Sequence, residues 1–98
     1  MKYFLYKLIP PRPTFNADMN EQEQATMNTH MGYWGELTNK GKSVVYGPVF
    51  DPEGVYGMAV IEVEADDEAQ AIATNDPAVT DGVCTYQLIP MMVGMIRK

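Results

Sequence analysis

VYGMAVIEVEADDEAQAIAT, residues 55–74, contains a strand that is followed directly by a helix. Residues 55–64 have the two-residue period of a strand, in which Ala59, Ile61 and Val63 alternate with Met58, Val60 and Glu62. Acidic residues then begin a short helix at Asp66, because carboxylates in a first turn oppose the helix dipole favourably. The residues that share the apolar face of this helix are Ala69, Ile72 and Ala73. A strand and a helix in such close succession indicate a mixed fold.

The chain on either side of this segment supplies the remaining elements of one domain, residues 1–98. A long helix is predicted from Asn20, where Asn20 and Glu23 form a capping box, to Gly41. The other predicted strands are Lys2–Ile9, Ser43–Tyr46 and Val83–Ile89. The order β-α-β-β-α-β predicts a ferredoxin-like α+β fold, in which two helices cover one face of a four-stranded antiparallel sheet.

His30 is the only histidine in the chain, and it lies within the apolar stripe of the long helix. That stripe consists of Met27, Met31, Trp34 and Leu37. A group that exchanges a proton near neutral pH is therefore expected on the face that packs against the rest of the protein. Gly32 and Gly35 interrupt the same helix, and we expect them to allow close approach of another backbone.

The second face of the sheet needs a partner, because the strands carry apolar residues on both sides. Leu5 and Val60, for example, alternate with apolar neighbours that point the other way. Two helices cover only one face, so we expect a homodimer that packs sheet against sheet, giving a dimeric α+β barrel. The apolar tail, residues 91–98, either extends that interface or folds over its own domain.

The composition bounds the possible partners. Seven Lys and Arg stand against thirteen Asp and Glu, for a net charge of -6, which argues against nonspecific nucleic-acid binding and against docking on an anionic membrane. The apolar N-terminal stretch is too short to span a bilayer. The single cysteine, Cys84, allows no intrachain disulfide, and with no signal peptide recognisable we expect a cytoplasmic protein. One Cys and one His also make a zinc site unexpected.

Several stretches resemble the YCII-related family when taken in order. They are KYFLYKLIP (residues 2–10), His30, GKSVVYGPV (41–49), AVIEVE (59–64), DDEAQA (66–71) and DPAV followed by GV (76–83). The resemblance covers most of the chain and implies a dimeric ferredoxin-like barrel with an active site built on a His–Asp pair. His30 matches the family histidine and Asp76 the aspartate. The chain departs from the better-known subgroup by its long proline-bearing loop, Pro10–Met19, and by lacking basic residues at the start of the first helix.

One relative is a dehydrochlorinase of aromatic degradation, and muconolactone isomerase has a similar fold. The resemblance therefore implies that His30 acts as general acid or base, oriented by Asp76, in elimination, isomerisation or dehydrochlorination of a small organic molecule. Such chemistry needs no metal or cofactor, and we expect none. The loop Pro10–Met19 is a candidate lid. The residues predicted to line a substrate pocket are Tyr6, Tyr33, Trp34 and Tyr46.

Other interpretations stay open on the residues alone. The same pocket fits a noncatalytic ligand-binding or accessory dimer, and dimerisation itself is a third possible role. An inward histidine is often a hydrogen-bonded core residue, and Asn75-Asp76-Pro77 is good chemistry for ending a helix. The tyrosines also suit core packing with a hydroxyl at the edge, and Trp34 suits a core anchor.

Overall fold

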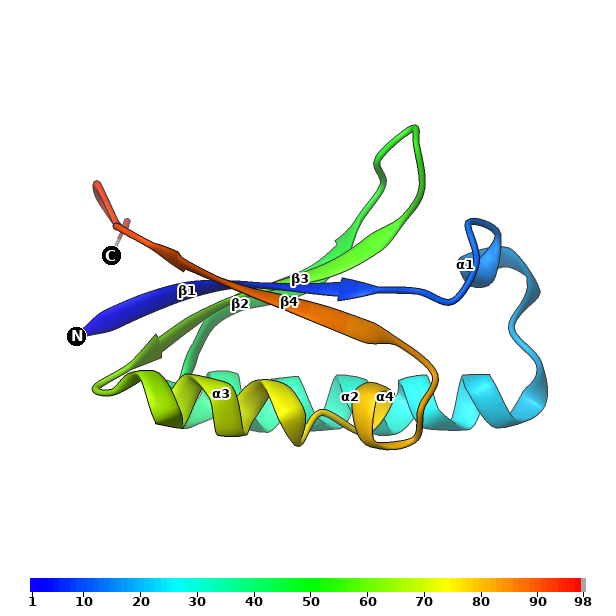
Figure 1. Ribbon diagram of the computed structural model, residues 1–98, viewed down its shortest axis with the longest axis horizontal. Coiled ribbons are helices and arrows are strands. Elements are labelled where there is room, and N and C mark those ends of the chain that lie inside the picture. Colours follow the sequence, from blue (N-terminus) through cyan, green and yellow to red (C-terminus); the bar gives the residue numbers. More distant parts are fainter. Residues whose placement is uncertain (98) are drawn as a thin grey trace.

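The computed structural model describes residues 1–97 and contains a single four-stranded antiparallel sheet in the order β2-β3-β1-β4. The strands are β1 (Lys2–Ile9), β2 (Ser43–Val49), β3 (Tyr56–Val63) and β4 (Thr85–Met91). The helices are α1 (Phe15–Asp18), α2 (Glu21–Asn39), α3 (Asp66–Thr74) and α4 (Pro77–Thr80). Helices α2, α3 and α4 lie on one side of the sheet, while α1 stands at one end of it (Figure 1). The predicted ferredoxin-like α+β fold is confirmed.

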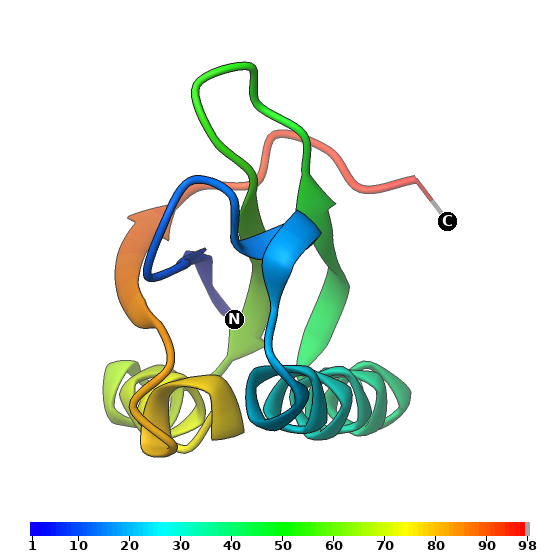
Figure 2. The same cartoon turned by 90° about the vertical axis from the view of Figure 1, so that its right-hand side faces the viewer.

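Helix α2 begins and ends where its capping residues predict. The Glu23 amide donates to Asn20 Oδ1 over 2.8 Å, and the Asn20 amide donates to Glu23 Oε1 over 3.0 Å, which completes the capping box. Gly41, with φ of +80°, follows the helix in the left-handed conformation that glycine adopts without strain. These two signals fix the length of α2, which runs beside the shorter α3 beneath the sheet (Figure 2).

The structure differs from the predicted elements at the short helices α1 and α4 and in the bounds of β2 and β4. Helices α1 and α4 were not predicted, because four residues are too few to show a helical period. Strand β2 continues through Pro48 to Val49. Proline is tolerated there because β2 is an edge strand, and no neighbouring strand on its open side needs the missing N–H for a hydrogen bond. Strand β4 begins only at Thr85, because the two preceding amides donate to the carbonyl of Ala78 in α4.

The core lies between the sheet and the helices. Alternate residues of β1 and β3 point toward the helices and are buried, as the predicted alternation requires. The largest of the core side chains with under 2% exposure are Trp34, Tyr6, Ile61 and Val63.

Within residues 1–97, no second backbone approaches the two glycines of α2, in contrast to the expectation. A Cβ atom at Gly35 would lie 3.4 Å from the Tyr46 hydroxyl, which is a side-chain contact. A Cβ atom at Gly32 would have no neighbouring atom within 4 Å. Gly35 therefore leaves room for a side chain of β2, and Gly32 faces open space.

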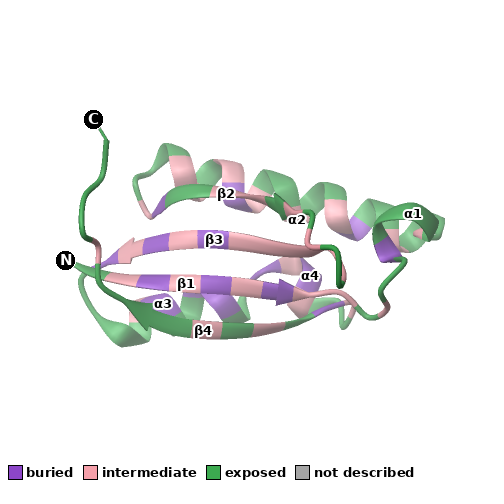
Figure 3. Cartoon of the chain, turned by 90° about the horizontal axis from the view of Figure 1, so that it is seen from above, coloured by how far each residue is buried: buried purple, intermediate pink, exposed green. Residues whose placement is uncertain are grey.

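The opposite face of the sheet carries a continuous apolar row. Val45, Val60, Leu5 and Ile89 occupy successive strands in register across the whole sheet. Val45 and Ile89 are 49% and 42% exposed, and the strands on this face show no covering element (Figure 3). Met92 and Met95 of the tail are each 92% exposed, so they do not pack on their own domain. Among residues 1–97, no helix has the length and apolar character to cross a membrane.

Candidate functional site

His30 and Asp76 meet on the helical side of the sheet. Helix α2 carries His30, and Asp76 stands at the junction of α3 and α4, where it is the N-cap of α4. The Nδ1 atom of His30 lies 2.8 Å from Oδ1 and 3.0 Å from Oδ2 of Asp76. The imidazole side chain is 13% exposed, whereas the carboxylate is fully buried. The two residues therefore form a hydrogen-bonded pair in which Asp76 is fully buried and His30 is partly exposed.

Three further donors hold the Asp76 carboxylate. The Tyr6 hydroxyl and the Trp34 indole Nε1 each donate to Oδ2 over 2.8 Å, and the Ala78 amide donates to Oδ1 over 2.9 Å. These donors come from β1, α2 and α4. A buried carboxylate is tolerated only when it is well hydrogen-bonded, and this one has four partners.

The surroundings of Asp76 favour its charged form. Burial acts to raise the pKa of the Asp76 carboxyl, but the hydrogen bonds from His30 and Trp34 and the adjacent imidazole outweigh it, so this pKa lies below its ordinary value. Burial, together with the negative charge of Asp76, raises the pKa of the Tyr6 phenol well above its ordinary value, so Tyr6 remains a donor.

An ionised Asp76 determines which nitrogen of His30 carries the proton. A carboxylate only accepts, so Nδ1 of a neutral His30 must donate to it, and Nε2 then has a free lone pair. Nε2 makes no hydrogen bond to residues 1–97. Within the same range no buried side-chain nitrogen or oxygen lacks a partner, so Nε2 is accessible rather than sealed in the core. His30 is arranged to exchange a proton through Nε2.

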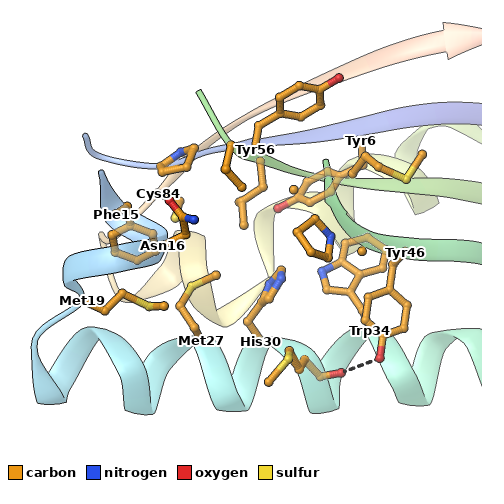
Figure 4. Close-up of a pocket in the computed structure, with 18 of the residues that line it drawn as sticks. Tyr6, Phe15, Asn16, Met19, Met27, His30, Trp34, Tyr46, Tyr56 and Cys84 are labelled. Carbon is orange, nitrogen blue, oxygen red and sulfur yellow. Dashed lines mark hydrogen bonds between the residues drawn. The ribbon is translucent and has the colours of Figure 1, made fainter. Parts of the chain in front are cut away.

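A cavity of about 420 Å³ lies beside His30, between the sheet and α2. Figure 4 shows the imidazole pointing into it between Met27 and Trp34. Most of the wall is apolar or aromatic, from β1, α1, α2 and the β2–β3 hairpin. Its size is within the range of small-molecule sites, about 300–1,000 Å³.

Three of the four aromatic residues predicted for the pocket line this cavity, namely Tyr6, Trp34 and Tyr46. Tyr33 does not: its hydroxyl donates to the Ile72 carbonyl over 2.7 Å, and its ring packs edge-on against Trp34. Tyr33 precedes Trp34 by one residue and therefore points about 100° away around the helix, toward α3 rather than toward the cavity.

Sequence reasoning missed several residues of the site. Phe15, Asn16 and Met19 line the cavity from the segment around α1, and Cys84 lines it from the position just before β4. The Trp34 bond to Asp76 was also missed, although a signal was present. Trp34 follows His30 by four residues, so both side chains lie on the same face of α2 and reach the same acceptor.

One arginine fastens the segment around α1 to α2. Arg12 donates to both carboxylate oxygens of Glu23, at 2.9 and 2.8 Å, and to Asp18 Oδ1 at 2.8 Å. The hydrogen bonds from Arg12 and the Asn20 amide lower the pKa of Glu23 to about 2, so the ion pair persists in mild acid. Phe15, which is only 4% exposed, is thereby held at the cavity wall. The predicted lid segment therefore forms part of the cavity wall in this structure.

Comparisons with known proteins agree with this fold. A family model described as the YCII-related domain matches residues 1–92. No curated protein matches the chain by sequence. Among solved structures, the chain is similar to the 5-chloro-2-hydroxyhydroquinone dehydrochlorinase from Burkholderia phenoliruptrix AC1100 in complex with 2,5-dihydroxybenzoquinone, with 18% identity, a TM-score of 0.60 and 96% of each chain covered. At that identity, the similarity establishes a shared fold.

Proposed function

Because this chain belongs to the YCII-related family, we propose that it is a cofactor-independent enzyme in which His30 is the general acid or base and Asp76 orients it. One observation carries the proposal: Asp76 engages Nδ1 of His30, while Nε2 opens toward a cavity large enough for a small molecule. The reaction class is proton transfer at a carbon next to a carbonyl or enol group, leading to elimination, isomerisation or dehydrochlorination.

The proton has a defined route in this geometry. Nε2 accepts a proton from the substrate carbon, and the imidazolium that forms is stabilised by the anionic Asp76. In an elimination, the C–H electron pair becomes a new double bond as the neighbouring C–Cl bond breaks and chloride leaves. In an isomerisation, Nε2 returns the same proton to another carbon of the conjugated system. Both paths leave His30 neutral once its proton is returned or released.

The buried setting of Asp76 contributes by preorganisation. Tyr6, Trp34 and the Ala78 amide hold the carboxylate in place before any ligand enters. The imidazole therefore needs no reorientation when its charge develops, which is the condition under which a fixed charge lowers a barrier.

The protein is further proposed to be a homodimer, packed through the apolar row on the open face of the sheet. Four apolar residues in register across four strands form a surface that favours burial, and the partner of matching shape is a second copy. A buried, unpaired Cys84 thiol fits a reducing compartment, and a cytoplasmic location is part of the proposal.

Hydrogen–deuterium exchange at carbon tests the proposed chemistry without knowledge of the natural substrate. The protein is incubated in D₂O with cyclic β-diketones, butenolide lactones and chlorinated hydroquinones, and proton NMR follows loss of the C–H signal and release of product. We expect exchange or turnover that disappears in His30→Gln and falls by about 10²-fold or more in Asp76→Asn.

A matched control separates chemistry from folding. Asp67→Asn makes the same chemical change at an exposed position on α3 and should leave the rate unchanged. Wild-type rates in a folded His30→Gln variant would refute the role given to His30.

The second candidate is noncatalytic binding of the same class of molecule. Its support is the cavity wall, where Met19, Met27, Met31 and Met58 provide adaptable apolar contacts that favour binding of varied ligands. Saturable binding, with no exchange or turnover across the panel, would favour this function over catalysis.

A further inference from the structure

The cavity beside His30 has an unusual charge balance. Among the described residues that line it, none is Asp, Glu, Lys or Arg, and His30 is the one histidine. Lys7, which precedes the lining residue Leu8, has its Nζ 4.4 Å from the centroid of the Tyr56 ring, and Arg12 is committed to Glu23 and Asp18 by charged hydrogen bonds. Within residues 1–97, the wall therefore offers no free cation to pair with an anionic ligand.

The charges around the cavity oppose an anionic ligand further. Asp76 lies directly behind His30 and is ionised, so the pair carries one negative charge whenever the imidazole is neutral. The whole chain carries a net charge of -6. A carboxylate entering the cavity would lose its hydration without gaining a partner, which is among the most costly changes in protein recognition.

The shape and chemistry of the wall favour a flat apolar body. Phe15, Trp34 and Tyr46 present aromatic surface to the cavity, and methionine side chains line it beside them, whereas the Tyr56 ring points away (Figure 4). Polar atoms are few, and because the Tyr6 hydroxyl is committed to Asp76, a ligand hydroxyl or carbonyl can meet Nε2 of His30 or the side chains of Asn16 and Gln24.

From these observations we infer that the cavity selects an uncharged ring molecule with a hydroxyl or carbonyl group that faces His30, and that it discriminates against carboxylates. The inference rests on the proposed function, since it names the substrate class of the same site. The preference for uncharged ligands is attributed to the lack of a Lys or Arg among the described residues of the wall. Adding such a cation to the wall should therefore weaken that preference.

Two probes of equal skeleton and different charge test the inference. Isothermal titration calorimetry at pH 7 compares 2-naphthalenemethanol, which is neutral, with 2-naphthoate, and NMR of the Trp34 indole N–H verifies that each occupies the cavity. We expect the alcohol to bind at least about tenfold more tightly. Equal or tighter binding of naphthoate would overturn the inference, and so would failure of both probes to bind.

A charge added at the wall supplies the control. Asn16 is exposed and lines the cavity from α1, so Asn16→Lys should narrow the preference for the alcohol by several-fold. Gln22→Lys adds the same charge at a site on α2 that does not line this cavity, and should leave the preference unchanged. A preference unaltered by Asn16→Lys would contradict the stated origin of the specificity.

The binding assay is independent of turnover. Absence of exchange chemistry together with the expected preference would contradict the proposed catalysis and leave the ligand class intact. Turnover that depends on His30, together with tight binding of naphthoate, would support the proposed catalysis and contradict the inferred ligand class.

Discussion

Tyr6 and Trp34 pack with their rings tilted by 35° and ring centroids 4.8 Å apart, while both donate to the same carboxylate oxygen, Oδ2 of Asp76. The two rings come from β1 and α2, so the buried anion joins the sheet to the helix as well as orienting His30. Removing that anion would leave several buried donors unpaired, a change that costs far more than loss of a surface charge does. The stability of the core and the geometry of the site are therefore coupled through Asp76.

Asp76→Asn should make the free energy of unfolding less dependent on pH in the acid range. Because the folded-state pKa of Asp76 is lowered, the unfolded chain binds this proton first, so the contribution of Asp76 to stability is complete above the unfolded-state pKa of about 3.9. That contribution is lost as pH falls through the folded-state pKa. Urea unfolding between pH 7 and pH 2.5 should show the gap between wild type and variant shrinking as the pH falls. A gap that is constant over this range would contradict the assignment.

The tautomer of His30 is directly measurable. Long-range ¹H–¹⁵N NMR spectra of the neutral imidazole should show the proton on Nδ1 in the wild type, because the ionised Asp76 accepts only there. In Asp76→Asn the amide no longer enforces that choice, and a mixture of tautomers is expected. Asp67→Asn serves as the unchanged reference. A wild-type proton found on Nε2 would remove the basis for a free base facing the cavity.

Arg12→Gln should loosen the cavity wall with little cost to the fold. The Arg12 side chain is 36% exposed, and ion pairs in contact with solvent contribute little to global stability. Hydrogen exchange across residues 12–19 should nevertheless accelerate, and the neutral naphthalene probe should bind several-fold more weakly. Lys40→Gln, which removes an exposed ion pair with Glu36 elsewhere on α2, should alter neither quantity. Unchanged exchange in Arg12→Gln would show that Phe15 alone holds the segment.

Leu5→Glu should convert the proposed dimer to a folded monomer. Leu5 lies at the middle of the apolar row on the open face, and a carboxylate there would be buried without a partner in a dimer but solvated in a monomer. Light scattering after size exclusion gives the mass, and circular dichroism reports the fold. Asn39→Glu adds the same charge on an exposed part of α2 and should leave the mass unchanged. A wild-type monomer at micromolar concentration would refute the dimer itself.

Gly32→Ala should stabilise the protein by about 1 kcal/mol, since alanine is the better helix former and its methyl group would meet no atom within 4 Å beyond its chain neighbours and the adjacent helix backbone. For a domain of this size that gain corresponds to a rise in Tm of about 4–8 °C. The opposite sign is expected for Gly41→Ala, because φ of +80° strains any residue with a Cβ. Calorimetry of both variants gives the comparison.

The parts of the fold that could be predicted are those with strong local signals. Asn20 with Glu23, and Gly41 at the other end, define α2, and the alternation in β1 and β3 defines the core face. Helices α1 and α4 could not be predicted, since neither is long enough for a pattern. The start of β4 depends on bonds to the Ala78 carbonyl that exist only after α4 has formed.

Within the candidate site, His30 and Asp76 could be predicted from the sequence, whereas the other hydrogen-bond partners of Asp76 could not. His30 stands out as a polar residue in an apolar stripe, and Asp76 was matched through the family resemblance. The convergence of Tyr6, Trp34 and Ala78 on one carboxylate joins residues that are up to 70 positions apart. No spacing rule reaches that far, because such contacts depend on how the sheet and helices pack.

Trp34 is the chain's one tryptophan, and it both lines the cavity and donates to Asp76. Its intrinsic fluorescence therefore originates entirely from the site, with no second indole to dilute the signal. Ligand entry, protonation of the neighbouring imidazole and rupture of the carboxylate's bonds should each perturb a single emitter. Trp34 is therefore an intrinsic fluorescent probe of the site, and unlabelled wild-type protein is sufficient to follow events at His30 in real time.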